Sequence, residues 1–532
     1  MIFLKRFFLL FLLISITIIA DAQIEIGFLP LEIDQNNQIS DFFISNPNKK
    51  FHSSFQPFDK QTVFKNDTLK SNNFIISDKN KFEICFLKDK KAQIKVNTIP
   101  LFQSEVGFDA LKNNSTFFQS GGLKITTSIG SKILIQSQFK AGLIRESNFI
   151  DTIIESSRIV PGLGIAYLQK TDKTYSFQNF SGSITYAPKS FINFQLAKDK
   201  IFIGDGYRSL LLSDVANNYP YFKTSLSFLN FQYNVWYSWF YNIQDAYGIK
   251  SDFKNKYGTF HYLSWNATKN ISISFFENVI FQGTDTTRSR GFDVNYLNPV
   301  IFFRPVEYSL GSSDNSMMGL NLSINFLKKF KWYTQIVLDE FFLKEIRARK
   351  GWWANKQGIQ TGIKHINTFG INHLSTHVEF NWVRPYTYTH GSPDQSYTHF
   401  NQALTHPFGA NFTELIVCAN YHKNKWLLSS KLILSTLGKD SISASSNIGQ
   451  NIFLSYTTRN NEYGNYTGQG VKTTFLHAEI KLNYCLVPDL NLRIETGIIQ
   501  RVFKNENGFD RRTPFFFLGI KTDLYNFYRD LL

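Results

Sequence analysis

Cysteine, long apolar segments and catalytic motifs are scarce in this 532-residue chain, and each absence excludes a class of protein. The three cysteines, Cys85, Cys418 and Cys485, are odd in number and have no CxxC spacing, so the sequence supports neither a disulfide framework nor a zinc site. No apolar run after residue 22 approaches the roughly 18 residues that a transmembrane helix requires. Neither a GxSxG elbow nor an HExxH pair is present, which removes two classes of hydrolase from consideration.

The first 22 residues have the composition of a secretory signal peptide. Lys5 and Arg6 provide a positive n-region, and the stretch "FFLLFLLISITIIA" is an apolar core. The sequence then reads Ala20-Asp21-Ala22, a small-x-small cleavage site. We expect cleavage after Ala22, with an uncleaved anchor helix as the alternative. Since no cysteine follows the cleavage point directly, a lipoprotein is not expected.

Aromatic and basic residues are what the chain has in excess. Its 54 Phe, 25 Tyr and 8 Trp make it 16% aromatic, yet the mean hydropathy is slightly negative, which indicates that aromatic and polar side chains alternate. The formal net charge is +16, and cleavage would remove two cations and one anion to leave +15. A basic exported protein favours anionic partners such as lipopolysaccharide or acidic polysaccharide. A general preference for Lys and Asn would also explain the charge, and nucleic acid is a poor candidate because no basic cluster is present.

From about residue 100 onward, apolar and polar residues alternate with a period of two. The stretch "TFLHAEIKLNY" places Leu476, Ala478 and Ile480 on one face and His477 and Glu479 on the other. The stretches "LNLRIETGI", "LNLSINF" and "THVEFNW" repeat the pattern. This period over about ten residues predicts strands with one face suited to lipid and one suited to water.

The connections between these strands alternate between short and long. Tight turns are predicted at "GSK" near 130, "APKS" near 188, "LN" at 229, "ATKN" near 268, "KKF" near 329, "NTFGIN" near 369, "KNK" near 424 and "VPD" near 488. Long connections are predicted at roughly 145–176, 200–220, 243–257, 282–316, 341–356, 383–412, 435–472 and 501–513. Such alternation is typical of outer-membrane barrels, which have short periplasmic turns and long outward loops.

The predicted fold is therefore an all-β transmembrane antiparallel β-barrel of about eighteen strands, running from about 101–109 to about 515–528. An even strand count places both termini in the periplasm. Aromatic residues near strand ends are expected to form the interfacial girdles, namely Trp236, Trp239, Trp265, Trp332, Trp426, Tyr525 and Phe527. The alternative is a soluble β-sandwich, propeller or β-helix, but no fixed-period repeat is present and charged residues occupy one face of most strands.

Three regions follow from this interpretation. Residues 1–22 are the signal peptide, 23–100 form a polar, Asn/Lys-rich periplasmic N-terminal extension, and 101–532 form the barrel. The extension is expected to carry a small strand pair around "NFIIS" and "FEICFL", or to be partly disordered.

The stretch "NYLNPVIFFRPVEYSL" at 295–310 is too apolar for an ordinary loop, while Pro299 and Pro305 exclude a central strand or a helix interior. Its charged residues, Arg304 and Glu307, exclude a lipid-facing span. Non-helical backbone is tolerated at membrane depth where it is buried in protein. We therefore expect this loop, and the long loops in general, to fold into the mouth of a wide barrel.

The residues able to carry chemistry gather in these long connections. Flat aromatic faces beside Arg, Asn and Asp suit sugar rings, because the rings stack and the hydroxyls take hydrogen bonds. The candidate polysaccharide-binding residues are Asp205, Tyr207, Arg208, Arg304, Glu307, Tyr308, Trp352, Trp353, Asn355, Arg384, Tyr386, Tyr388, His399 and Asn401. The alternative is that these residues only hold a plug together.

Other chemistries receive less support from the sequence. The spacings of nine and seven between His390, His399 and His406 fit no helical metal-ligand motif. Carboxylates such as Asp205 and Glu307 suggest a glycosidase pair, but the sequence gives no distance between them. We expect no catalytic residue, no metal and no cofactor.

Five loop motifs carry a resemblance to a known family. They are "FIGDGYRSLLLSD" at 202–214, "LNPVIFFRPVEYS" at 297–309, "KGWWANKQG" at 350–358, "NWVRPYTYTHG" at 381–391 and "YTHFNQALTHPFGANF" at 397–412. Over about 100–532 the chain resembles the outer-membrane proteins called RemB in gliding bacteria, which are grouped with the Wzi-type capsule assembly barrels.

The resemblance implies an eighteen-stranded outer-membrane barrel. For the Wzi branch it implies anchoring of capsular polysaccharide without catalysis, and for the RemB branch a role in gliding motility. Residues 23–100 go beyond a simple Wzi-type barrel. The expected function is thus a non-enzymatic barrel that binds or anchors capsular or exopolysaccharide, with outer-membrane lipid around it. The alternatives are a motility or adhesion component with a protein partner, and a porin-like channel with an open lumen.

Overall fold

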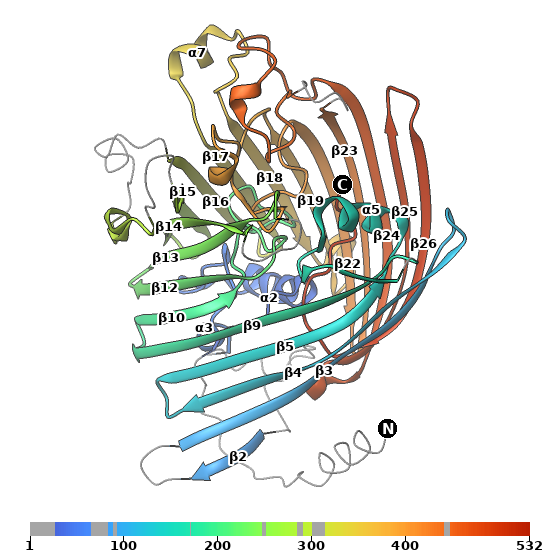
Figure 1. The fold of residues 1–532 in the computed structure, drawn as a ribbon. Helices are drawn as coiled ribbons and strands as arrows, with labels where there is room; N and C mark the ends of the chain where they lie inside the picture. The colour runs from blue at the N-terminus through green and yellow to red at the C-terminus, as the bar shows by residue number, and fades with distance from the viewer. Residues whose placement is uncertain are drawn as a thin grey trace.

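A computed structural model describes residues 27–64, 83–88, 93–170, 172–246, 252–284, 291–300, 314–440 and 447–532, and its main feature is a closed barrel (Figure 1). Eighteen antiparallel strands form the wall, which confirms the predicted fold class. The barrel closes where the last strand pairs with the first, from Phe515 opposite Asp109 to Lys521 opposite Gln103. Closure pairs the backbone of every wall strand with two neighbours, as a strand in lipid requires.

The wall strands are β3 (Gln93–Asp109), β4 (Asn114–Ile129), β5 (Ile133–Arg145), β9 (Thr174–Lys189), β10 (Ile192–Asp199), β12 (Tyr219–Phe228), β13 (Phe231–Asn242), β14 (Lys254–Asn266), β15 (Ile271–Gln282), β16 (Asn315–Phe326), β17 (Phe330–Leu338), β18 (Gln357–Ile366), β19 (Leu374–Val383), β22 (Phe412–Lys423), β23 (Trp426–Lys439), β24 (Val471–Val487), β25 (Leu492–Asn505) and β26 (Asp510–Lys521). Two further strands, β2 (Glu83–Lys88) and β8 (Tyr167–Lys170), pair with β3 and β9. The remaining strands form three small pairs: β1 (Phe55–Gln56) with β11 (Phe202–Ile203), β6 (Ile159–Val160) with β7 (Gly164–Ile165), and β20 (Thr398–His399) with β21 (Gln402–Ala403). Within the described ranges, the α-helices are α2 (Ile33–Ser45), α3 (Lys60–Phe64), α5 (Asn148–Ser157) and α7 (Leu343–Ala348).

The two faces of the wall differ as the sequence alternation predicts. On β25, Ile494 and Ile498 are 38% and 53% exposed, whereas Arg493 and Glu495 are buried. Apolar side chains therefore face outward and charged ones face the lumen, the reverse of a water-soluble protein. A closed barrel with an apolar outer face is the architecture that spans the outer membrane, and the protein is located there.

The connections confirm the predicted polarity of the barrel. All eight predicted tight turns fall between consecutive strands at one end, and the long loops are at the other end. The connection predicted at 501–513 is shorter than expected. Strand β25 continues to Asn505 and β26 begins at Asp510, so only residues 506–509 connect them. In the described parts of the chain, no helix combines the length and the apolar character that a membrane span requires.

The N-terminal region packs against the inside of the barrel, a position that sequence reasoning did not anticipate for a periplasmic extension. Residues 27–64 form a small core of their own around Phe43 and Phe51, which stack with ring centroids 3.8 Å apart. The hydroxyl of Tyr262 on β14 donates to Ser54 at 2.6 Å, and β1 pairs with β11 of a long loop. In Figure 1, α2 lies within the curve of the wall. Residues 1–26, which include the expected signal peptide, and 65–82, which include "NFIIS", lie outside the described residues.

The C-terminal strand also ends earlier than predicted. We expected a strand to about residue 528, but β26 ends at Lys521 and residues 522–532 turn back into the lumen. The phenol of Tyr528 donates to Asp214 at 2.7 Å, and Arg529 pairs with Glu146 at 2.7 Å. The tail does not extend the wall, because β26 already pairs with β3 and the barrel is closed. Its polar contacts inside the barrel hold it in place.

The predicted aromatic girdles are only partly correct. Trp265 and Trp426 are 40% and 49% exposed near the short turns, as an interfacial position requires. Trp236, in contrast, is fully buried and stacks on Phe260 with centroids 4.9 Å apart. Tyr525 and Phe527 were also assigned wrongly: Tyr525 donates to Gln103, and Phe527 packs on Phe118, because both belong to the C-terminal tail inside the barrel.

Candidate functional site

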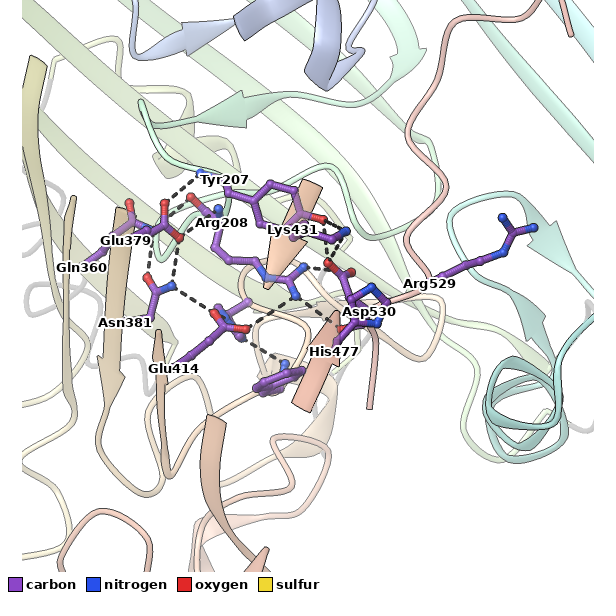
Figure 2. Close-up of polar contacts among 12 residues, drawn as sticks. Tyr207, Arg208, Gln360, Glu379, Asn381, Glu414, Lys431, His477, Arg529 and Asp530 are labelled. Carbon is purple, nitrogen blue, oxygen red and sulfur yellow. Dashed lines mark hydrogen bonds and ion pairs between the residues drawn. The ribbon is translucent and has the colours of Figure 1, made fainter. Parts of the chain in front are cut away.

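The loop after β11 runs through the lumen and carries three of the predicted site residues. Arg208 is fully buried, and its guanidinium lies 3.4 Å from Asp530 and 3.6 Å from Glu414. Burial by itself would lower the pKa of Arg208, but Asp530 and Glu414 together raise it above the ordinary value. Arg208 therefore stays charged and is held on two sides by carboxylates of the protein (Figure 2).

The wall of the barrel fixes the backbone of this loop. Glu379 on β19 accepts hydrogen bonds from the amides of Tyr207 at 2.7 Å and Arg208 at 3.2 Å. Asn381 donates to both Glu379 and Glu414, at 2.9 and 3.0 Å. Figure 2 shows the chain of contacts that results. A polar network in which the members satisfy one another gives the loop one defined position.

The C-terminal tail completes the network. Asp530 accepts a hydrogen bond from the phenol of Tyr207 at 2.6 Å and lies 3.0 Å from Lys431 on β23. Burial would raise the pKa of Asp530, but Arg208 and Lys431 hold it well below its usual range. Asp205 is likewise engaged, since it pairs with Lys331 on β17. All three predicted residues of this loop are thus brought together in the lumen, where their partners are protein groups.

Two further predicted residues, Trp352 and Trp353, meet three residues that were not predicted at the extracellular end. We call this group the rim cluster: Trp352, Trp353, Tyr456, Arg459 and Glu462. The indole N–H groups of Trp352 and Trp353 both donate to the same oxygen of Glu462, at 3.1 and 2.9 Å. Arg459 pairs with the other oxygen of Glu462, and its guanidinium lies 4.3 Å from the ring centroid of Trp353. Hydrogen bonding from Arg459, then from the two indoles, lowers the pKa of Glu462.

The loops that carry the rim cluster are joined by backbone hydrogen bonds. The amide of Trp353 donates to the carbonyl of Glu462 at 3.0 Å, and the amide of Gly464 donates to Lys350 at 2.8 Å. This pairing joins the loop that carries Trp352 to the loop that carries Tyr463 and Tyr466, which are 46% and 64% exposed. Trp352 itself is half-buried, so the two paired loops expose aromatic side chains at the extracellular end.

Three more predicted residues support the rim from below. Asn355 accepts a hydrogen bond from the amide of Phe342 at 3.2 Å, and Arg384 donates to the carbonyl of Trp352 at 3.3 Å. Burial lowers the pKa of Arg384. The phenol of Tyr386 donates to Asn447 at 2.8 Å, and its ring packs edge-on against Trp353. These residues position the rim cluster and are themselves largely covered.

The remaining predicted residues are separate from both groups. Tyr388 is buried and donates to the carbonyl of Leu210 at 2.9 Å. His399 is enclosed by the rings of Phe240 and Tyr241, and burial lowers its pKa to about 3. Asn401 donates to Ser157 at 3.2 Å. Arg304, Glu307 and Tyr308, with most of the unusual stretch 295–310, lie outside the described residues.

The glycosidase pair suggested for Asp205 and Glu307 stays untested because Glu307 lies outside the described residues, and metal ligands can be sought only in the described parts of the chain. There, no group of three or more His, Cys, Asp and Glu side chains is placed to hold a metal ion. His406 contacts Glu414 on β22 at 2.6 Å, whereas His399 accepts a hydrogen bond from the amide of Tyr241 on β13. The two histidines therefore bind different strands of the wall. Glu379 and Glu414, the carboxylates that Asn381 bridges, are fully covered and bonded to the protein.

Sequence reasoning missed the partners in both groups. Glu379 was recognised only as a water-facing residue of an alternating strand, and Lys431 and Asp530 were not singled out. Glu462 and Arg459 lie in the long connection predicted at 435–472, from which no site residue was chosen. From the sequence alone, these residues could be recognised only as charged side chains at inward-facing or loop positions. Their charge does not reveal which residue each of them contacts.

Comparisons with known proteins identify the fold. No protein-family model and no curated protein matches the chain. Among solved structures, Wzi from Escherichia coli, described as an outer-membrane protein involved in group 1 capsule assembly and a carbohydrate-binding β-barrel, matches with a TM-score of 0.56 at 12% identity, over 94% of this chain and 100% of that one. OprD from Pseudomonas aeruginosa matches with a TM-score of 0.44 at 9% identity, over 82% of this chain and 98% of that one. The closed, eighteen-stranded barrel of this chain therefore has the outer-membrane β-barrel fold of Wzi.

Proposed function

We propose that this protein is a non-enzymatic outer-membrane barrel that binds surface polysaccharide at its extracellular rim. The observation that carries the proposal is the position of Trp352, whose half-buried indole is fixed by Glu462. The loop that supplies Glu462 also carries the exposed Tyr463 and Tyr466. Sugar rings stack on such rigid aromatic faces, and little side-chain entropy is lost on binding because the rings are already held. The carbohydrate binding described for Wzi, which shares the fold, supports the same proposal.

The charge around the rim suits an acidic polymer. Helix α7 and the residues after it have no buried side chain, and they carry Lys344, Arg347, Arg349 and Lys350 against Glu345. Exposed cations attract an anionic chain over a distance of about 10 Å at 0.1 M salt, so binding is expected to weaken as salt rises.

The filled lumen argues against the porin alternative. Residues 27–64, the loop that carries Arg208 and the C-terminal tail all contact the inner wall. Among the described residues, one cavity beside Asp205 and Lys431 has a volume of about 140 Å³, and a second beside Lys140 and Asn179 has about 120 Å³. Roles in gliding motility, or in adhesion through a protein partner, stay predictions from the sequence resemblance.

Polysaccharide extracted from the host's own surface is the probe that tests the proposal. The detergent-purified protein is expected to bind it saturably, and Trp352→Ala should weaken binding about fivefold, since an aromatic contact contributes about 1 kcal/mol. Trp426→Ala removes a tryptophan that is 49% exposed at the opposite end of the barrel and serves as the control. Equal loss in both variants, or no binding by the unaltered protein at low salt, would contradict the proposal.

A further inference from the structure

The outer wall of the barrel is not uniform, and a shallow groove of about 430 Å³ crosses β19 and β22 to β25 on the lipid-facing side. Leu415 and Leu434 line it and are 37% and 41% exposed, while their neighbours Glu414 and Ser435 point inward and are buried. Phe380, which is 42% exposed, lies on β19 at the edge of the groove. The groove therefore opens toward the membrane and is separate from the lumen.

Strand register sorts the groove residues into two rows. In the row nearer the membrane centre, Leu415, Leu434, Leu476 and Val502 are direct cross-strand partners. The next row, one step toward the extracellular end, consists of Thr413, Thr436, Thr474 and Lys504 in the same pairing. An aliphatic band is thus followed by a band of hydroxyl groups that ends in a cation.

Basic residues continue this order at the extracellular edge. Lys504 and Arg512 are 45% and 66% exposed, and Lys472, two residues before Thr474 on the same face of β24, is also exposed. Two acids lie beside them: Asp510 is 3.1 Å from Lys504 and 3.5 Å from Arg512, and Glu506 accepts a hydrogen bond from the amide of Lys472 at 3.0 Å. Three cations against two carboxylates leave a net positive edge above the hydroxyl band.

This sequence of aliphatic, hydroxyl and cationic bands matches one kind of molecule. Acyl chains fill an apolar groove, threonine hydroxyls bond ester or hydroxyl oxygens, and ammonium and guanidinium groups bind phosphate strongly. We propose that the groove is a binding site for a phosphorylated glycolipid of the outer leaflet, with its acyl chains against Leu415 and Leu434 and its phosphate between Lys504 and Arg512. The site does not depend on the polysaccharide role of the rim, which lies on other loops.

Asp510 allows a test in the opposite direction, because its carboxylate competes with the lipid phosphate for Lys504 and Arg512. Its removal in Asp510→Asn frees Lys504 and Arg512 and is expected to tighten lipid binding about threefold. The double variant Lys504→Gln/Arg512→Gln removes the charge-assisted bonds and is expected to weaken binding about tenfold. General misfolding cannot produce a gain in one variant and a loss in the other.

The experiment measures binding of diphosphoryl lipid A to the full-length, delipidated protein in detergent by native mass spectrometry. Lipid A with both phosphates removed is the parallel probe. It should bind the unaltered protein and the double variant with equal affinity, and more weakly than diphosphoryl lipid A binds the unaltered protein. Lys423→Gln/Lys425→Gln removes two exposed cations at the opposite end of β22 and β23 and is the matched control.

Three results would overturn the site. The first is unchanged lipid A affinity in the double variant, and the second is equal affinity of the unaltered protein for the two forms of lipid A. The third is displacement of lipid A by an equimolar amount of inorganic phosphate, because the acyl chains would then contribute nothing to binding.

Discussion

Arg208 and Asp530 face each other in the centre of the barrel, with Nη1 and Oδ1 3.4 Å apart, although 322 positions separate them in the sequence. The contact joins a lumenal loop to the end of the chain, and Glu414 and Lys431 connect the pair to the wall. The barrel interior is therefore held by long-range ion pairs, whereas the wall is held by pairs of neighbouring strands.

Breaking this buried pair is expected to destabilise the interior strongly. Asp530→Ala leaves Arg208 without one of its two carboxylate partners, and removal of one member of a buried pair costs about 3–5 kcal/mol. We expect the tail to become sensitive to limited proteolysis while the barrel stays resistant to heat unfolding on a gel. Asp245→Ala, which removes a carboxylate whose side chain is 79% exposed, is the control. A protected tail in Asp530→Ala would show that the pair contributes little.

His399 predicts a loss of stability in acid. Burial lowers its pKa to about 3 in the folded protein, against an ordinary value of 6.5. As the pH falls, His399 therefore binds a proton in the unfolded state before it does so in the folded state. The free energy of unfolding has its full value above pH 6.5 and decreases as the pH falls toward 3. Between pH 6.5 and 5 the expected loss is about 2 kcal/mol.

The measurement is the urea midpoint at these two pH values for the unaltered protein and for His399→Gln, which has no titrating group. Asp41 works in the opposite direction because burial raises its pKa to about 6, so the difference between the two proteins is the informative quantity. An identical pH dependence would contradict the prediction.

The turn between β12 and β13 should accept a stabilising change. Leu229 is 84% exposed and has a φ of 52°, a left-handed conformation that costs a non-glycine residue about 1 kcal/mol. Asparagine adopts this conformation more readily and suits a two-residue hairpin. Leu229→Asn is thus expected to raise the free energy of unfolding by up to about 1 kcal/mol, while Leu229→Val, which is β-branched, should lower it. Urea unfolding of the refolded barrel distinguishes the two directions.

Removal of the N-terminal segment should open the barrel. Residues 27–64 fill part of the lumen and bond to Tyr262 and Ser264 of the wall. A variant that lacks 27–64 is expected to show large, steady conductance in a planar lipid bilayer, whereas the unaltered protein should conduct little. Heat-modifiability on a gel checks that the variant is folded. Equal conductance of the two proteins would mean that this segment does not control the path through the lumen.

The sequence determined the wall of this protein. Period-two stretches such as the one around Glu379 determined which side chains face lipid and which face the lumen, because strand side chains alternate whatever their partners are. Short turns such as the one at Leu229 fixed the order of the strands, since a tight turn can only join antiparallel neighbours. The strand number, the polarity of the barrel and its place in the outer membrane follow from these local rules.

Only the tertiary structure decided what fills the barrel. The contact between Arg208 and Asp530, the inward course of residues 522–532 and the packing of 27–64 depend on groups far apart in the chain, and no local pattern encodes which charge meets which. The same holds for the rim cluster, where Trp352 is held in place by a hydrogen bond to Glu462, over a hundred residues later in the chain. Strand pairing is periodic and can be predicted, whereas the packing of irregular loops and tails in a closed lumen is a single three-dimensional solution.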